Sequence, residues 1–149
     1  MENIIDMVLA LKNVSIFQNL PDHVLADIAE ITKVGSIDKG TTFIKKGDLG
    51  EEMYIIKSGT AQIHDGEHII TNLSENQIVG ELAILAPVQR TADVTALEDM
   101  TVFKINRDYF SDLLAEEFEI VSGVMVSLVD TIIKNNEKIK NFNASKTDQ

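Results

Sequence analysis

Residues 79–92 read VGELAILAPVQRTA, and this segment interrupts a series of predicted short strands with one predicted helical turn. Gly80 allows the backbone to approach a ligand closely. The free N–H groups at the start of the turn, from Glu81 to Ala83, form a natural site for one anion. Arg90 can return a guanidinium to the same place, so the segment is predicted to hold a single phosphate through charge-assisted hydrogen bonds.

The Glu81 carboxylate calls for a second chemical group on the ligand. A carboxylate only accepts hydrogen bonds and repels phosphate, so its natural target is a hydroxyl group. A ligand with one phosphate and a neighbouring hydroxyl, such as a ribose phosphate, satisfies both Glu81 and Arg90. Two simpler interpretations stay open. Gly80-Glu81 can merely start a helix, where a carboxylate is favourable near the positive end of the dipole, and Arg90 can be an ordinary surface residue.

Short apolar segments separated by turn residues surround this segment. The predicted strands lie near residues 42–44, 53–56, 61–64, 69–73, 92–97 and 101–105, and the turns include Gly47-Asp48-Leu49-Gly50, Ser58-Gly59 and Asp65-Gly66. Such close spacing of short strands favours an antiparallel barrel or jelly roll over a parallel sheet with crossover helices.

Apolar residues at helical spacing flank the predicted strands on both sides. They occur from Ile4 to Leu11, after Pro21-Asp22 and again beyond Asn106, with a short break at residues 13–19. We therefore expect one α+β domain over residues 1–138, built from a mainly antiparallel β roll between N- and C-terminal helices. Its parts are helices within 1–32, the roll over 33–106 and C-terminal helices over 107–138, followed by a polar tail over 139–149.

The composition excludes several classes of function. Acidic residues outnumber basic ones by 24 to 13, for a formal net charge of -11, so no nucleic acid is expected as a partner. Cysteine is absent, which excludes disulfides, thiol nucleophiles and thiolate metal sites. The chain starts with acidic residues where a signal peptide is basic, and its apolar stretch at 120–129 is about half of the ~20 residues that a membrane span needs. We expect a cytoplasmic protein with no membrane insertion by this chain.

The central segment also resembles a known motif. Gly80-Glu81-Leu82-Ala83, followed by Arg90-Thr91-Ala92 ten positions after the glycine, resembles the phosphate-binding cassette of the cyclic nucleotide-binding domain family. Upstream, the residues that resemble the strand and turn pattern of this family are Gly47-Asp48-Leu49-Gly50, Tyr54, Ile56 and Ser58-Gly59. The resemblance extends from about Leu11 to Lys138. It implies an eight-stranded roll with flanking helices, whose ligand is cyclic AMP or cyclic GMP and which needs no cofactor.

The resemblance assigns a role to each part of the motif. It implies that the Glu81 carboxylate binds the ribose 2′-hydroxyl group. It also implies that Arg90 binds the cyclic phosphate together with backbone N–H groups, those of Leu82, Ala83 and Ala92. The candidate ligand-binding residues are therefore Gly80, Glu81, Leu82, Ala83, Arg90, Thr91 and Ala92. Threonine at position 91 accompanies either purine in the family, so the base is left open.

Three residues depart from the family pattern. Val79 replaces a common aromatic residue and Gln89 a common proline, and both changes are expected to affect packing and loop stiffness more than chemistry. Asp93 stands where the family usually has a small, often hydroxylated residue. An extra carboxylate near the phosphate would weaken binding unless it points outward.

Metal binding and catalysis lack support in the sequence. His64 and His68 flank the hairpin signal Asp65-Gly66, but no third ligand accompanies them, so we expect a solvated hairpin and no metal site. With three histidines, no cysteine and no nucleophile-elbow serine, neither a hydrolase nor another jelly-roll enzyme can be assembled. The chain is therefore not expected to be an enzyme.

The last predicted helix has a broad apolar face between residues 121 and 133. This face can serve as core, as a lid over a nucleotide, or as the seam of a homodimer. The candidate lid residues are Val121, Val124, Met125 and Leu128.

Together these patterns predict a regulatory sensor module. It binds cyclic AMP or cyclic GMP in the roll and signals through movement of its C-terminal helices to an effector domain or protein that the sequence does not identify. The alternative is a degenerate cyclic nucleotide-binding fold that acts only in protein association or dimerisation.

Overall fold

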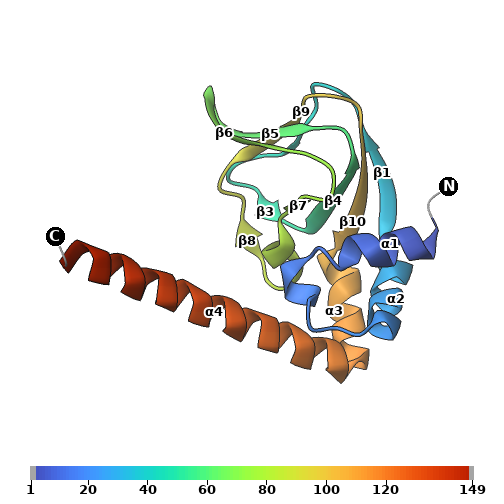
Figure 1. Ribbon diagram of the computed structural model, residues 1–149. Coiled ribbons are helices and arrows are strands. Elements are labelled where there is room, and N and C mark those ends of the chain that lie inside the picture. The colour runs from blue at the N-terminus through green and yellow to red at the C-terminus, as the bar shows by residue number, and fades with distance from the viewer. Residues whose placement is uncertain (1–2, 148–149) are drawn as a thin grey trace.

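The computed structural model describes residues 3–147 and shows a β roll with helices gathered at one end of it (Figure 1). The helices are α1 (Ile4–Leu11), α2 (Asp22–Ile31), α3 (Arg107–Glu116) and α4 (Phe118–Thr147), with the 3-10 turns η1 (Ser15–Phe17) and η2 (Glu81–Ile84). The strands are β1 (Lys33–Ile37), β2 (Thr42–Ile44), β3 (Leu49–Gly50), β4 (Glu52–Ser58), β5 (Ala61–Asp65), β6 (His68–Leu73), β7 (Ile78–Val79), β8 (Val88–Gln89), β9 (Asp93–Ala96) and β10 (Met100–Asn106).

The strands form two four-stranded sheets and one short ribbon. The sheet orders are β1-β10-β4-β7 and β2-β9-β5-β6, and β3 pairs with β8 in the ribbon. Every pairing is antiparallel. The two larger sheets supply the eight strands of the expected roll, so the predicted α+β class is confirmed, with β3 and β8 as an addition.

Two apolar cores lie on opposite faces of the sheet that contains β4 and β10. In β10, Met100 and Val102 point into the roll, whereas Phe103 and Ile105 point toward the helices. Successive side chains of a strand alternate between its two faces, so one strand can serve both cores. The roll and the helical end are thereby joined through shared strands.

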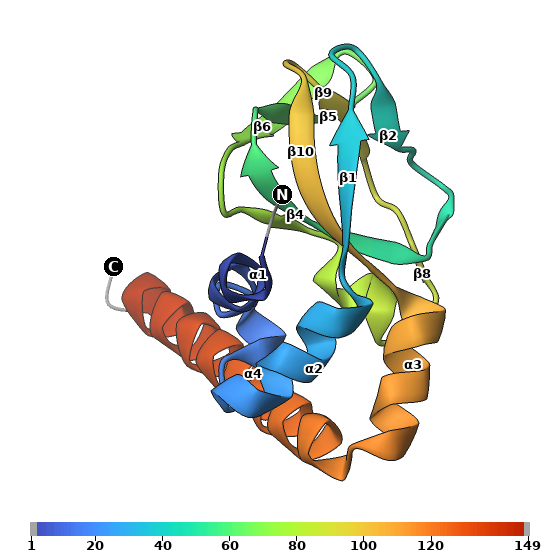
Figure 2. The same ribbon diagram turned by 90° about the vertical axis from the view of Figure 1, so that its right-hand side faces the viewer.

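The helical end packs around η1, in the segment where the sequence showed only a break. Phe17 of η1 is buried and its ring lies 5.7 Å from that of Phe110 in α3. The first turns of α4 cross η1 and the residues after it, and a Cβ atom added at Gly123 would collide with the Leu20 side chain. In Figure 2, α1, α2 and the N-terminal half of α4 (called its near half below) lie together below the roll.

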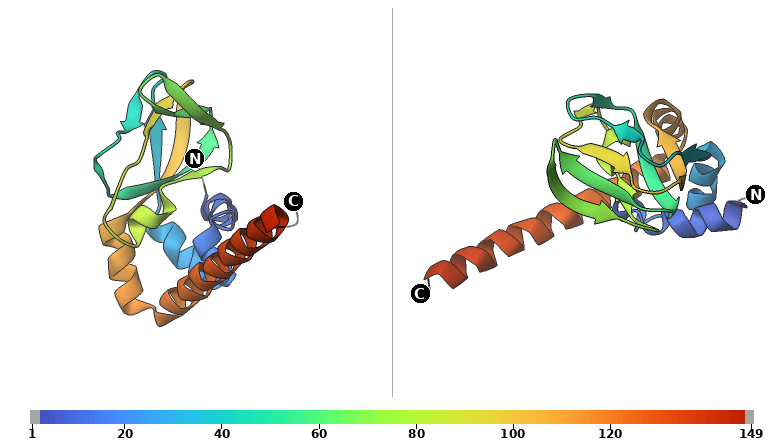
Figure 3. Two further views of the ribbon diagram at one scale, coloured as in Figure 1. Left: turned by 90° about the vertical axis from the view of Figure 1, so that its left-hand side faces the viewer. Right: turned by 90° about the horizontal axis from the view of Figure 1, so that it is seen from above.

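The C-terminal helix is longer than expected. We predicted that it ends near Lys138 and that residues 139–149 form a tail, but α4 continues to Thr147. This stretch has neither glycine nor proline to end a helix, although its polar character suggested a tail. The far half of α4 projects away from the rest of the molecule (Figure 3). Within residues 3–147, none of the helices combines the length and the apolar character needed to cross a membrane.

Candidate functional site

The turn η2 begins at a glycine that the structure requires. Gly80 has φ 79° and ψ 30°, in the left-handed region, and its backbone lies directly under the Arg90 guanidinium. A Cβ atom at Gly80 would collide with Nη1 of Arg90, and one at Gly50 would lie 2.7 Å from its Cζ atom. Two glycines from separate turns therefore make room for one guanidinium.

Hydrogen bonds hold the Arg90 guanidinium and backbone against the start of β4 and the turn before it. Its Nη2 atom donates to the Glu52 carbonyl oxygen at 2.5 Å. The Arg90 backbone N–H donates to the Asp48 carbonyl at 2.8 Å, and its carbonyl accepts from the Gly47 N–H at 2.9 Å. Partial burial lowers the pKa of Arg90, an effect opposed by Tyr54 and Glu52, and the group stays cationic near neutral pH. A cation is thus fixed beside η2.

A cavity of about 490 Å³ opens between η2, Arg90 and the sheet that contains β5 and β9. Its size lies within the range of small-molecule sites. All seven residues predicted to bind the ligand line it: Gly80, Glu81, Leu82, Ala83, Arg90, Thr91 and Ala92. The other lining residues, largely apolar, are Ile44, Ile63, Ile78, Val79, Val88, Gln89 and Val94. The structure therefore brings the predicted residues together around one space, whose lining combines polar groups with apolar side chains.

The backbone donors of η2 are only partly free. The Ala83 N–H donates to the Gly80 carbonyl at 3.0 Å, as the geometry of a 3-10 turn dictates. The N–H groups of Glu81 and Leu82 come before the first such bond and have no partner three residues earlier within the turn. The predicted phosphate contact from Ala83 would therefore have to be shared with Gly80.

The Glu81 carboxylate is already engaged by a residue that the sequence did not suggest. Both of its oxygens accept from the Ser15 hydroxyl, at 2.8 Å and 2.9 Å. Ser15 lies in η1, 66 positions earlier in the chain. No motif surrounds this serine, and only the folded structure brings it to Glu81.

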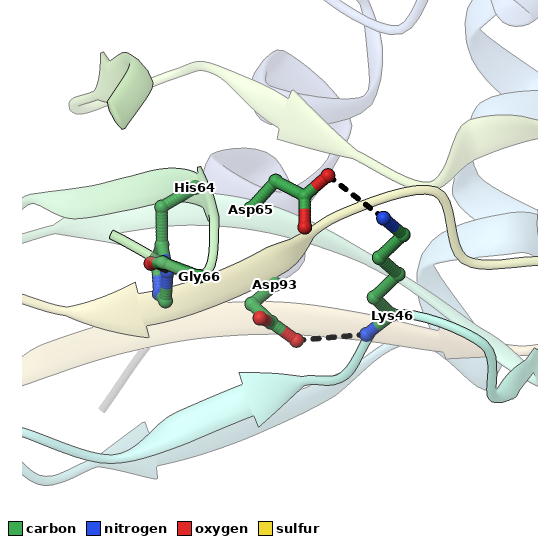
Figure 4. A network of polar contacts seen from close by, with 5 residues as sticks. All are labelled: Lys46, His64, Asp65, Gly66 and Asp93. Atoms are coloured by element: carbon green, nitrogen blue, oxygen red, sulfur yellow. Dashed lines mark hydrogen bonds and ion pairs between the residues drawn. The ribbon is translucent and has the colours of Figure 1, made fainter. Parts of the chain in front are cut away.

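The Asp93 carboxylate is bound to the chain outside the cavity. Its Oδ1 atom accepts from the Lys46 backbone N–H at 2.8 Å (Figure 4), and Asp93 is not one of the residues that line the cavity. The Lys46 ammonium group lies 2.7 Å from Asp65, and this hydrogen bond lowers the pKa of Asp65. Whether Asp93 weakens ligand binding stays a prediction.

The histidines of the β5–β6 hairpin do not form a metal site. Both ring nitrogens of His64 are used, with Nδ1 2.8 Å from the Gly66 carbonyl and Nε2 2.7 Å from the Thr95 hydroxyl. His68 pairs with Asp65 across the hairpin and not with His64. Among residues 3–147, no three histidine or carboxylate side chains come together in a way that could hold a metal ion.

The candidate lid residues do not reach the cavity in this arrangement. Val124 is buried among the helices and Leu128 packs against the same cluster, while Val121 is half-buried and Met125 is 60% exposed. None of the four lines the cavity. The near half of α4 packs on η1 instead, where Asn19 donates to Ser127 at 2.9 Å. A lid formed by these residues stays a prediction that requires α4 to move.

The structure thus combines a β roll, a glycine-led turn, a carboxylate and a guanidinium around one cavity. The comparison with protein families agrees: the model described as "Cyclic nucleotide-binding domain" matches residues 34–117, more than half of the chain. The chain belongs to this family, as its sequence predicted.

Similar proteins include subunits of signalling kinases. The cAMP-dependent protein kinase regulatory subunit of Debaryomyces hansenii is 32% identical over 114 residues, which are 76% of this chain and 25% of that protein. The cGMP-dependent protein kinase 2 of Mus musculus is 27% identical over 135 residues, 86% of this chain and 18% of that protein. The chain thus spans a quarter or less of these relatives.

A solved structure supports the fold itself. The N-terminal domain of a transcriptional regulator from Streptomyces coelicolor A3(2) aligns with a TM-score of 0.80 and 20% identity, over 87% of this chain and 94% of that one. At this identity the likeness shows the shared roll and helices.

Proposed function

We propose that this chain is a regulatory sensor of cyclic AMP or cyclic GMP that binds its ligand in the 490 Å³ cavity and signals through its C-terminal helices. The observation that carries the proposal is that Glu81, Arg90 and the start of η2 line one cavity together with apolar side chains. The family and the relatives named as kinase regulatory subunits support it.

The proposed contacts follow from the chemistry of each group. Arg90 and the N–H groups of Leu82 and Ala92 bind the cyclic phosphate, because they supply positive charge and donors. Glu81 accepts from the ribose 2′-hydroxyl. The purine lies against the apolar wall, and Thr91 at the rim leaves the choice of base open.

The proposed role is regulatory and not catalytic. The output then lies in an effector domain or a partner chain, and a kinase catalytic chain is one such partner, because the fungal relative is named a regulatory subunit. A signal leaves the domain when the ligand changes the packing of η2, η1 and α4.

Calorimetric titration with cyclic AMP, cyclic GMP and 5′-AMP tests this function. We expect one cyclic nucleotide to bind at a one-to-one ratio, and 5′-AMP to bind much more weakly because it carries a larger, acyclic phosphate group. Lys39→Ala, which removes an exposed cation far from the cavity, is the matched control for Arg90→Ala. If the folded protein binds none of the three nucleotides, the chain is not a sensor of these ligands.

A second candidate function, protein association, rests on the outer face of α4. Large apolar side chains on this face are between 52% and 80% exposed: Phe118, Met125, Val129, Ile132 and Ile139. A continuous exposed apolar patch of this kind is unusual on a monomer. The face is distinct from the one that holds Ile120 and Val124, which is buried in the helical core.

We infer that a second copy of the chain covers this face. Phe118, Met125, Ile132 and Ile139 are spaced by seven residues, which is the repeat of a two-stranded coiled coil. Pairing would bury on the order of 800 Å² per chain, the size of a standard stable interface. None of the residues on this seam is charged, so repulsion between copies at the seam is small.

Sedimentation equilibrium tests the homodimer. The double variant Ile132→Glu, Ile139→Glu should sediment as a monomer, whereas wild type should show a concentration-dependent dimer. Lys134→Glu is the control, because Lys134 is exposed but lies on the opposite side of the helix, and its substitution makes the same change in net charge as the double variant. Equal mass for all three proteins at every concentration would contradict the seam.

A further inference from the structure

The Ser15 hydroxyl binds the carboxylate that would accept a ligand hydroxyl, although Ser15 itself does not line the cavity. It is a single donor shared between both oxygens of Glu81, at 2.8 Å and 2.9 Å. A serine hydroxyl and a ribose hydroxyl make the same kind of charge-assisted hydrogen bond with a carboxylate. Because Ser15 bridges both carboxylate oxygens, a ligand hydroxyl that takes the same bridging position has to displace it.

Ser15 is also firmly attached to the helical end of the molecule. Its neighbours Ile16 and Phe17 are 3% and 1% exposed and belong to the helical core. The near half of α4 packs directly on η1, the short turn that holds Ser15. The hydrogen bond from Ser15 to Glu81 thus joins the cavity to the elements on which α4 rests.

We propose that Ser15 is a latch that the ligand displaces. In the ligand-free protein the Ser15 hydroxyl donates a hydrogen bond to the Glu81 carboxylate. When the ligand binds, its ribose 2′-hydroxyl replaces Ser15 as the donor. The turn η1, together with α4, is then released from η2. The proposal rests on the proposed function, since it requires a ribonucleotide in the cavity. In this proposal Ser15 controls how tightly Glu81 binds the ribose of the ligand.

If the ligand displaces Ser15, one variant should behave differently than if Ser15 only orients Glu81. If Ser15 must be displaced, part of the ligand's binding free energy is spent on breaking its hydrogen bond, and removing the hydroxyl returns that part. Ser15→Ala should therefore bind the cyclic ribonucleotide about tenfold more tightly, which is the worth of one hydrogen bond to a charged group. If Ser15 instead orients Glu81 for the ligand, the same variant binds more weakly.

The test compares two ligands and three proteins by calorimetry. The ligands are the cyclic nucleotide that wild type binds and its 2′-deoxy analogue, which has no hydroxyl with which to displace Ser15. We expect Ser15→Ala to gain affinity for the ribonucleotide only, and Ser15→Thr, which keeps a hydroxyl, to match wild type. Unchanged or weaker ribonucleotide binding by Ser15→Ala, or an equal gain for both ligands, would overturn the latch.

A distance measurement tests the release of α4. The chain has no cysteine, so Glu67→Cys on the β5–β6 hairpin and Lys134→Cys on α4 can carry one pair of spin labels per chain. The ribonucleotide should change the distance between the labels within a chain of this labelled protein, and the 2′-deoxy analogue should not. The same change with both ligands would show that Glu81 and Ser15 do not control the helix. If wild type binds neither ligand, the proposed function fails together with the latch, whereas binding without these differences removes the latch alone.

Discussion

Replacing Arg90 with alanine removes the cation that two glycines and two backbone tethers place beside η2. Hydrogen bonds to charged groups contribute about 1.5–3 kcal/mol each, so the loss of the phosphate contacts should weaken cyclic nucleotide binding on the order of 100-fold. The folded state should change little. The Glu52 carbonyl loses its donor at 2.5 Å, but a half-buried charge is also removed, and the net effect on unfolding should stay within about 1 kcal/mol.

Titration calorimetry and thermal unfolding of the same samples measure both effects. Arg90→Lys sharpens the test, because it keeps the charge but lacks the planar fork that fits between Gly50 and Gly80. We expect this variant to bind between wild type and alanine. A folded Arg90→Ala protein that binds the cyclic nucleotide as tightly as wild type would refute the assignment of the phosphate site, whatever Arg90→Lys does.

Three further outcomes are expected. Gly80→Ala should lose at least tenfold in nucleotide affinity and about 1–2 kcal/mol in the free energy of denaturant unfolding, because it adds both positive-φ strain and a collision with Arg90. Gly40→Ala is the control: its φ is 87° and the space around it is open, so it should show the strain alone and bind normally. Glu81→Ala should weaken a cyclic ribonucleotide more than its 2′-deoxy analogue in calorimetry, and equal weakening of both would make Glu81 purely structural. Stopped-flow association of a nucleotide with a protein of net charge -11 should speed up or stay constant with added salt, which screens beyond about 8–10 Å, and a steep loss of rate with salt would contradict the anionic ligand.

The roll could be predicted because its turns and strands leave a local pattern. The strands near 42–44 and 61–64 were visible as apolar segments between turn residues, and β2 and β5 lie there. The two-residue strands β3, β7 and β8 could not be predicted, since two residues show no periodicity. The fold could therefore be predicted from turn residues that separate short apolar segments only a few residues long.

The cavity was predicted in its composition but not in its connections. Gly80 and Arg90, ten positions apart, lie close together in the structure, because β8 pairs with β3 and brings Arg90 beside Gly50. The Ser15 contact joins groups 66 positions apart and depends on how η1 docks, which no local pattern reports. The same reason explains α4: its apolar face was visible, but which part packs on η1 and which part stays exposed depends on tertiary structure.

The turn that lines the cavity is also part of the helical core, and this contact would carry the proposed signal. Ile84, at the end of η2, is fully buried among the helices, while Glu81, at its start, faces the cavity. Arg107, the first residue of α3, donates to the Gly50 carbonyl at 2.6 Å, so α3 is tied to the glycine that makes room for Arg90. Close-packed cores do not absorb displacement by compression. A ligand that draws η2 toward its phosphate must therefore displace Ile84 and the helices packed on it, and the four-residue length of η2 leaves no slack in which the movement could be lost.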